Sequence, residues 1–188
     1  IGLDLGTSGL KGILIDDTQG VLAEASAPLS VSRPHEGWSE QSPADWIAAT
    51  EQVMDQLAAE GLRGVRGIGL SGHMHGATLL DAKDEVLRPC ILWNDTRSFE
   101  EAAELDGDPM FRRLTGNIVF PGFTAPKLMW VAHHEPGIRE RLAKVLLPKD
   151  YLRLWLTGEH VGEMSDAAGT SWLDTGKRDW SNELLQAT

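Results

Sequence analysis

The first fifteen residues constrain the fold more than any other part of the chain. An apolar run with one acidic residue, Asp4, precedes a Gly-Thr-Ser-Gly turn at residues 6–9 and a second apolar run at residues 12–15. This order predicts a strand, a tight turn and a second strand. A carboxylate in a buried strand needs a partner or a metal ion, and a turn of small residues presents N–H groups that can bind an anion.

The residues of this hairpin leave two interpretations open. Asp4 and the turn can hold a divalent metal and a phosphate together, or Asp4 can be an ordinary surface residue. The sequence has no G-x-x-x-x-G-K-[ST] motif, and the segment after the turn alternates like a strand rather than a helix. Any phosphate site here is therefore of a hairpin type.

The order of predicted elements indicates a mixed α/β fold. Strand-like runs cover residues 1–5, 10–16 and 20–28, and Ser42-Pro43 predicts a helix that runs to about Glu60 and ends at Gly61. Further strands are predicted at 65–71, 77–81, 91–93 and 144–147, and further helices near 97–105, 109–115, 124–135 and 149–157, with a final segment capped by Ser181. Three antiparallel-looking strands followed by a helix fit a ribonuclease H-like core better than strictly alternating strands and helices.

Composition excludes several classes of protein. The 188 residues fit one domain, and no apolar run approaches the roughly 18 residues that cross a membrane. A net charge of −11 argues against binding to nucleic acid or to anionic membranes. The single Cys90 excludes an internal disulfide, and the chain opens without a basic leader, so we expect a cytoplasmic location.

A second candidate site follows the strand predicted at 65–71. The polar turn at residues 71–76 contains two glycines and presents Met74 and His75 at a strand end, where ligand groups are often found. His73 and His75 could bind a metal, but no third ligand is near in the sequence. An imidazole that donates to and accepts from sugar hydroxyls is the favoured interpretation, and a purely structural histidine is the alternative.

Six short blocks together resemble one family of enzymes. The D-L-G-T-S hairpin and the G-x-M-H-G turn, in this order, resemble the xylulokinase branch of the FGGY carbohydrate kinases. Four further blocks agree with it: residues 91–97, 122–130, 147–152 and 165–170. The resemblance implies an actin-like ATPase domain with a mixed sheet and flanking helices, and it implies ATP and Mg²⁺ as cofactors.

The resemblance also implies roles for the hairpin. Asp4 would approach Mg²⁺, through a phosphate oxygen or a water molecule, and would be the catalytic group of this segment. Gly6, Thr7 and Ser8 would offer backbone and hydroxyl donors to the phosphates of ATP.

On the sugar side, the resemblance implies a pocket built from several segments. Met74 and His75 would line it, and they stand where glycerol kinases carry an Arg-Glu pair, which favours a ketopentose. Trp93 would form a wall or belong to the core, Asp95 would order the cleft or contact a hydroxyl, and Asp166 would approach the substrate or cap a helix. Three basic residues are expected to be structural ion-pair partners: Arg97, Lys127 and Lys149.

The implied function is transfer of the γ-phosphate of ATP to D-xylulose, giving D-xylulose 5-phosphate. A kinase for ribulose, xylitol or glycerol is an alternative, as is a sugar sensor without turnover, although a sensor has no need of Asp4. The family's general base lies in a later segment than Thr188. We therefore expect residues 1–188 to be an incomplete N-terminal kinase domain that is inactive alone and a possible homodimer in the full-length protein.

Overall fold

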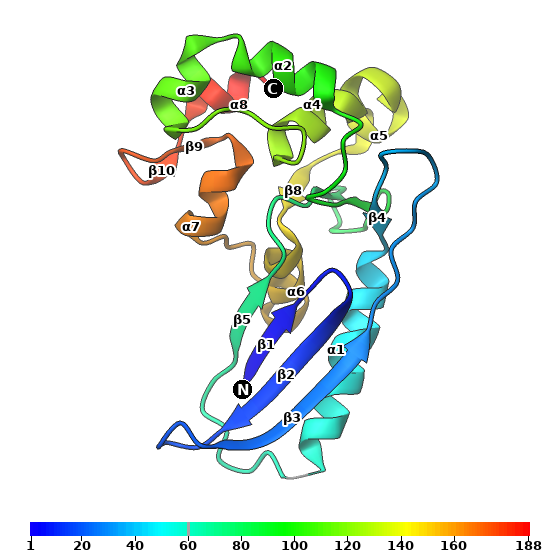
Figure 1. Cartoon of the computed structure of the whole chain (residues 1–188), viewed down its shortest axis with the longest axis vertical. Helices are drawn as coiled ribbons and strands as arrows, with labels where there is room; N and C mark the ends of the chain where they lie inside the picture. The colour runs from blue at the N-terminus through cyan, green and yellow to red at the C-terminus, as the bar shows by residue number, and fades with distance from the viewer. Residues whose placement is uncertain (60) are drawn as a thin grey trace.

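A computed structural model of the chain describes residues 1–59 and 61–188. Its centre is a four-stranded sheet in the order β3-β2-β1-β5 (Figure 1). Strands β1 (Gly2–Leu5), β2 (Gly9–Ile15) and β3 (Val21–Pro28) form the predicted antiparallel meander. Strand β5 (Gly69–Gly72) runs parallel to β1, so the sheet is mixed.

Strand β5 is shorter than the strand predicted at residues 65–71. Its pairing begins at Gly69, opposite Gly2, and residues 65–68 are not part of the sheet. Among the described strands, β5 has only β1 as a neighbour, and β1 is four residues long. The length of β5 is therefore set by its partner rather than by its own apolar residues.

One face of the sheet is covered by α1 (Pro43–Ala58). Trp46, Val53 and Leu57 are fully buried in the core beneath the strands. A Cβ at Gly12 would lie 2.4 Å from a methyl group of Val53, so the close approach of helix and sheet requires glycine there. The predicted end of this helix, Glu60, lies outside the described residues.

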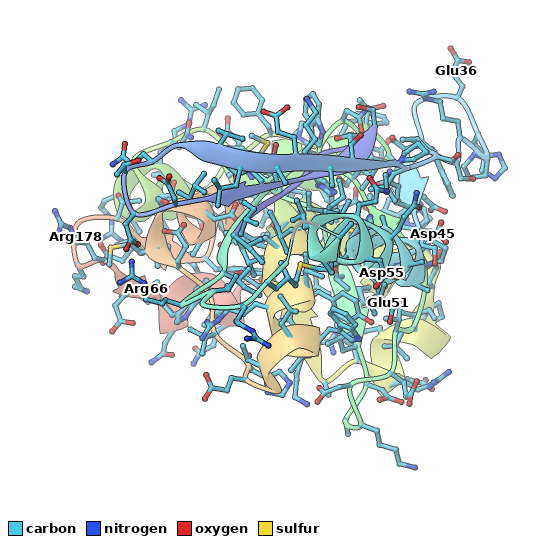
Figure 2. All side chains as sticks on the ribbon, turned by 90° about the horizontal axis from the view of Figure 1, so that it is seen from below. Glu36, Asp45, Glu51, Asp55, Arg66 and Arg178 are labelled. Atoms are coloured by element: carbon cyan, nitrogen blue, oxygen red, sulfur yellow. The ribbon has the colours of Figure 1, made fainter. Side chains whose placement is uncertain are left out.

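The other face of the sheet is exposed to solvent, since exposed side chains alternate with buried ones along β1 and β2. In Figure 2 the strands lie on one side of the molecule and α1 lies beneath them. The outer side of α1 is acidic, with Asp45, Glu51 and Asp55 exposed to solvent (Figure 2). In the described part of the chain, no helix is long and apolar enough to cross a membrane.

Helix α6 (Pro148–Thr157) packs against β5 and α1, and the remaining elements form a largely helical region beyond the carboxyl ends of β1 and β5 (Figure 1). Short pairs of strands connect it to the sheet: β4 (Glu40–Gln41) with β7 (Cys90–Ile91), and β6 (Thr78–Leu80) with β8 (Lys144–Leu146). Its helices and last strands are α2 (Phe99–Asp106), α3 (Pro109–Thr115), α4 (Thr124–His134), α5 (Pro136–Arg141), α7 (Met164–Ala167), η1 (Ala168–Thr170), β9 (Leu173–Asp174), β10 (Asp179–Trp180) and α8 (Asn182–Gln186).

Most of these helices were predicted, but the shortest elements were not. Helices α5 and α7 and the pair β9–β10 are too short to show a periodic pattern. Pro136 starts α5 directly after α4, because proline cannot continue a helix that precedes it. The strand predicted at 91–93 is only Cys90–Ile91, and Trp93 lies in the turn that follows.

Candidate active site

The turn of the N-terminal hairpin (residues 2–15) offers two backbone donors. The N–H of Gly6 donates to the carbonyl of Gly9 at 3.0 Å, so it is already engaged inside the turn. Among the described residues, the N–H groups of Thr7 and Ser8 have no protein acceptor. Thr7 and Ser8 therefore retain the donors expected for phosphate, and the expectation of a free donor at Gly6 is corrected.

The hairpin is anchored by a residue that sequence analysis missed. The side chain of Gln41 donates to the carbonyl of Thr7 at 2.7 Å and to that of Ser30 at 3.2 Å. Its oxygen accepts from the indole of Trp46 on α1, at 3.1 Å. This buried amide fixes the turn relative to the helix, and no local pattern around Gln41 indicates it.

Asp4 is exposed on the open face of the sheet, rather than buried as its apolar neighbours suggested. In the register of the strands, it lies beside Lys11 of β2 and Ser71 of β5. The side chain of Asp4 forms no hydrogen bond or ion pair with any described residue. Among the described residues, no cluster of three metal-ligating side chains is found. One free carboxylate beside two free N–H groups fits a metal held jointly with a phosphate or with water.

The second candidate, called here the His75 turn (residues 72–76), is held by contacts distant in sequence. His75 has a φ of +64°, which is unusual for a residue other than glycine. Its carbonyl accepts from Lys127 at 2.9 Å and from the hydroxyl of Thr124 at 3.2 Å. Its ring lies 4.7 Å from that of Phe123, and a Cβ at Gly169 would come within 2.1 Å of it.

The two histidines of this segment have different surroundings. The ring of His73 packs edge-on against that of Trp46, at 5.5 Å, whereas His75 packs against Phe123 and Gly169. Burial and the nearby charge of Lys127 lower the pKa of each histidine to about 4. A neutral His75 both donates and accepts hydrogen bonds near pH 7, as recognition of a hydroxyl requires.

Lys127 was expected to be an ion-pair partner, and this expectation is wrong. The side chain is fully buried, and its ammonium donates to the carbonyls of His75 and Gly122. No carboxylate of the described residues pairs with it, and burial lowers the pKa of Lys127 to about 7. Lys127 therefore joins the His75 turn to the start of α4.

Trp93 is not part of the buried core, since 44% of it is exposed. Its indole N–H donates to the hydroxyl of Thr7 at 3.0 Å, which brings the N-terminal hairpin and the segment after β7 together. A Cβ at Gly122 would lie 2.4 Å from the carbonyl oxygen of Trp93. Trp93 thus contacts the hairpin through its side chain and the start of α4 through its backbone.

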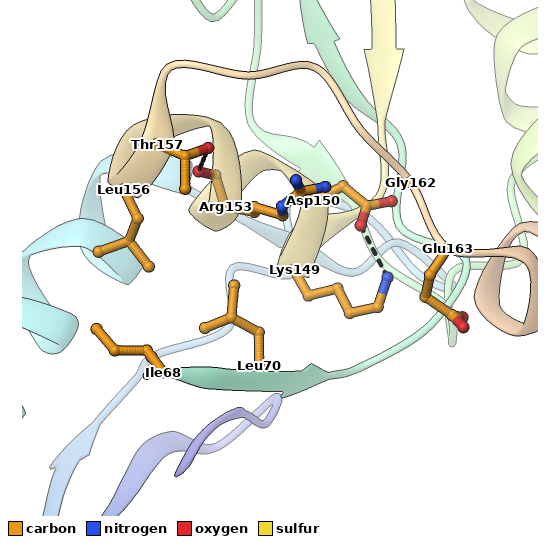
Figure 3. Close-up of a pocket in the computed structure, with 9 residues that line it drawn as sticks. All are labelled: Ile68, Leu70, Lys149, Asp150, Arg153, Leu156, Thr157, Gly162 and Glu163. Carbon is orange, nitrogen blue, oxygen red and sulfur yellow. Dashed lines mark hydrogen bonds and ion pairs between the residues drawn. The ribbon is translucent and has the colours of Figure 1, made fainter. Parts of the chain in front are cut away.

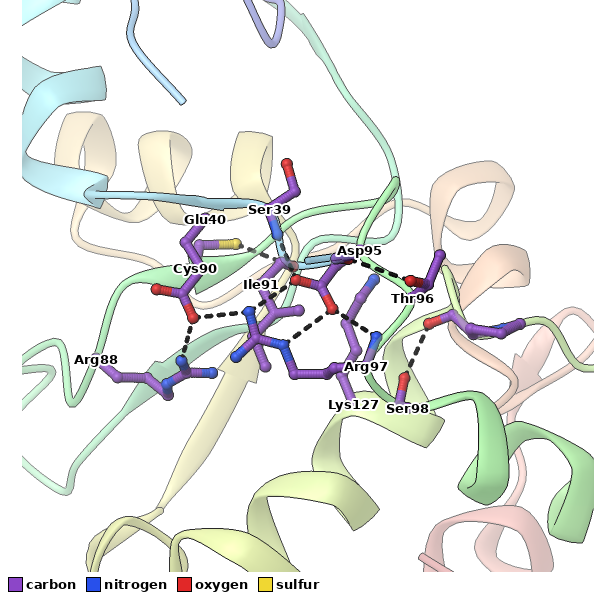
Figure 4. Close-up of polar contacts among 12 residues, drawn as sticks. Ser39, Glu40, Arg88, Cys90, Ile91, Asp95, Thr96, Arg97, Ser98 and Lys127 are labelled. Carbon is purple, nitrogen blue, oxygen red and sulfur yellow. Dashed lines mark hydrogen bonds and ion pairs between the residues drawn. The ribbon is translucent and has the colours of Figure 1, made fainter. Parts of the chain in front are cut away.

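Asp95 is enclosed in a charged network (Figure 4). It is 1% exposed, and its two oxygens accept from the N–H of Ser39 at 2.6 Å and from Arg97, whose guanidinium binds it at 2.9 and 2.7 Å. Arg97 also pairs with Glu40 at 2.8 Å, and Arg88 pairs with the same carboxylate at 2.5 Å. This geometry favours the ordering role of Asp95 over contact with a hydroxyl.

Asp166 approaches the site from α7 but is paired. Its carboxylate lies 2.8 Å from the ammonium of Lys149, which also donates to Asp150 at 2.8 Å. The cap of α7 is Glu163, whose side chain accepts from the N–H of Asp166, so Asp166 is not the helix cap.

Met74, next to His75, is 45% exposed.

A cavity of about 540 Å³ lies between β5 and α6, away from the His75 turn (Figure 3). Apolar side chains, including Ile68 and Leu156, line one end of it, and the Lys149–Asp150 pair lines the other. The candidate residues of the hairpin and of the His75 turn are not among those that line it.

The structure thus brings most of the candidate residues to one place. Strands β1 and β5 are parallel and in register, so the hairpin turn and the His75 turn lie at the same edge of the sheet. The Thr7–Trp93 bond and the contacts of Gly122, Lys127 and Gly169 connect these turns to the helical region. The two turns thus share one edge of a mixed sheet with flanking helices, which is the fold class predicted from the sequence, an actin-like ATPase domain.

Comparison with known proteins agrees with this assignment. Residues 1–188 match the N-terminal domain of the FGGY family of carbohydrate kinases. The chain is 56% identical over 189 residues to the xylulose kinase of Escherichia coli strain K12, a match that covers 100% of this chain and 39% of that protein. The chain belongs to the FGGY family of carbohydrate kinases, and it spans 39% of the length of this relative.

Solved structures are similar along almost the whole chain. A xyloylose kinase from Brucella ovis has a TM-score of 0.97 at 66% identity, over 99% of this chain and 40% of that one. A xylulose kinase from Rhodospirillum rubrum has a TM-score of 0.93 at 34% identity, over 98% and 39% of the two chains. The predicted fold class, an actin-like ATPase domain with a mixed sheet, is confirmed.

Proposed function

We propose that the protein containing these 188 residues is an ATP-dependent sugar kinase that transfers the γ-phosphate of ATP to D-xylulose. The observation that carries the proposal is the parallel register of β1 and β5, because it sets the N-terminal hairpin beside the His75 turn. The names of the bacterial relatives support xylulose as the sugar. By the family resemblance, Met74 and His75 stand where glycerol kinases carry an Arg-Glu pair. This difference supports a ketopentose over glycerol as the substrate.

The proposed roles follow from the groups that remain available. Thr7 and Ser8 bind phosphate oxygens through their N–H groups, and Asp4 holds Mg²⁺ through water or a phosphate oxygen. Bound Mg²⁺ would supply neutralisation of the phosphate charge. His75, neutral near pH 7, exchanges hydrogen bonds with sugar hydroxyls, and the exposed faces of Met74 and Trp93 enclose the sugar.

We also propose that residues 1–188 are an incomplete N-terminal kinase domain without activity of its own. Phosphoryl transfer uses a base to orient the attacking hydroxyl. The two carboxylates near the sugar site are engaged, Asp95 by Arg97 and Asp166 by Lys149. The base is therefore proposed to come from outside these residues, in keeping with the 39% share of the relative's length.

The test is a coupled assay of ATP turnover by the full-length protein with xylulose, ribulose, xylitol and glycerol. We expect the largest kcat/KM with xylulose, and no turnover from residues 1–188 alone. If kcat/KM were largest with another sugar, that sugar would be the proposed substrate in place of xylulose. Sugar binding without ATP turnover would favour the alternative of a sugar sensor. Homodimerisation and a cytoplasmic location stay predictions.

A further inference from the structure

The hydrogen bond between Trp93 and Thr7 joins two sites that the proposed function keeps separate. It spans 86 positions in the sequence and 3.0 Å in the structure. Both side chains are accessible to water, so without this bond each would form a hydrogen bond with water instead. The bond therefore adds little to the stability of the folded protein. Its placement, between the N-terminal hairpin and the proposed sugar wall, points to a role other than stability.

The direction of this bond fixes what Thr7 can do. An indole N–H only donates, so the Thr7 hydroxyl must accept from Trp93 and keeps its single hydrogen for another acceptor. No acceptor for that hydrogen is found among residues 1–59 and 61–188. The Thr7 backbone is held by Gln41, which donates to its carbonyl at 2.7 Å. Thr7 is therefore oriented as a hydroxyl donor beside the free N–H groups of the turn, and a phosphate oxygen is the acceptor that fits.

Trp93 is in turn connected to the sugar side. Its carbonyl packs against Gly122, and the carbonyl of Gly122 accepts from Lys127, which also holds His75. The backbone of Trp93 is thus fixed relative to the His75 turn, while its ring remains 44% exposed. A ligand that covers the ring restricts the indole, and with it the N–H that points to Thr7.

We propose that the Trp93–Thr7 hydrogen bond couples occupancy of the sugar site to binding of the ATP phosphates. A bound sugar fixes the indole, the indole N–H occupies a lone pair of the Thr7 hydroxyl, and the hydroxyl hydrogen is directed to a phosphate oxygen. Trp93 acts on the phosphate through Thr7 and is a positioning residue in that respect. The inference rests on the proposed function, and coupling is reciprocal, so ATP strengthens sugar binding by the same factor.

The test is calorimetric titration of the full-length protein with a non-hydrolysable ATP analogue and Mg²⁺, with and without xylulose. We expect xylulose to strengthen analogue binding about tenfold in the wild type, within the usual range of such couplings. Trp93→Phe keeps the ring and loses the N–H, and Thr7→Val keeps the shape and loses the hydroxyl. Each variant should reduce the enhancement to less than about twofold, and the double variant should reduce it no further, since both remove one bond.

Two controls separate this bond from general damage. Thr7→Ser keeps a hydroxyl and should retain the enhancement, and Trp155→Phe changes an exposed tryptophan of α6 and should leave it unaltered. An undiminished enhancement in Trp93→Phe, or strictly additive losses in the double variant, would overturn the inference. Phosphorylation of xylulose by the wild type is measured in parallel, so failure of the proposed function is seen separately as the absence of turnover.

Discussion

The N-terminal hairpin and the His75 turn lie at the same edge of the sheet but are built in different ways. The hairpin turn is closed by neighbouring residues, with Gly6 bonded to Gly9, although Gln41 anchors it to the rest of the fold, and Asp4 is exposed on a strand. The His75 turn takes its shape from residues 49 to 94 positions away, namely Thr124, Lys127 and Gly169. The hairpin presents backbone donors and a free carboxylate, whereas the turn presents the half-buried, neutral imidazole of His75.

Because of this difference, we expect substitutions in the two regions to affect the reaction rate and the stability of the fold differently. An exposed group without partners can be changed with little effect on folding. A residue packed against a ring, or bonded to a buried carbonyl, supports both the site and the fold. Substitution of the exposed side chain of Asp4 should therefore alter rates alone, and substitutions around His75 should alter both rates and melting temperature.

The largest expected effect is that of Asp4→Asn in the full-length protein. Removing this charge should lower kcat by about 1000-fold, the upper range for loss of one electrostatic contact to a transition state. The melting temperature should not change, because the carboxylate of Asp4 bonds no described residue. Glu24→Gln, another exposed carboxylate of the same sheet, is the matched control and should leave kcat unaltered. A comparable loss of kcat in both variants would contradict a specific role of Asp4 in the reaction.

Gly169→Ala should lower kcat/KM for the sugar by about 100-fold, the usual cost of a displacement of about 1 Å in a site. The added methyl would lie 2.1 Å from the His75 ring, so the ring must move. Gly137→Ala makes the same change on α5, where nothing lies within 4 Å, and should be neutral. Steady-state kinetics and melting temperature measure both, and wild-type kinetics in Gly169→Ala would contradict the packing around His75.

Lys127→Met should raise the KM for the sugar about tenfold, because a hydrogen bond from a charged donor contributes about 1.5–3 kcal/mol. The KM for ATP should change less, since Lys127 holds the His75 turn and not the hairpin. Lys83→Met, at an exposed lysine, is the control. Equal increases in both KM values would show that the two regions do not respond independently.

The smallest expected effect is a loss of stability in mild acid. Burial holds the pKa of His73 near 4 in the folded protein, below its ordinary 6.5, so between these values only the unfolded chain binds the proton. Stability is therefore complete above pH 6.5 and declines as the pH falls, by about 1 kcal/mol for this residue at pH 5.5. His73→Gln should make the melting temperature less dependent on pH between 7 and 5.5, and an unchanged slope would contradict this origin.

Sequence alone was sufficient where structure is local. The meander of β1, β2 and β3, the start of α1 at Ser42-Pro43 and the hairpin turn follow from alternation, proline placement and small residues within a few positions. Elements of two to six residues, such as α5, α7 and β9, were missed because they complete no periodic pattern. The extent of β5 was mispredicted because its partner strand sets it.

Only the tertiary structure decided how the site residues are used. It showed that Asp4 is solvent-exposed, that Lys127 bonds carbonyls rather than carboxylates, and that Asp95 is fully engaged by Arg97 and Ser39. It also joined Trp93 to Thr7 across 86 positions. The sequence determined which chemical groups are present and which local turns carry them. Which groups meet, and which are left free to bind a ligand, depends on packing between distant segments, and no local pattern encodes that.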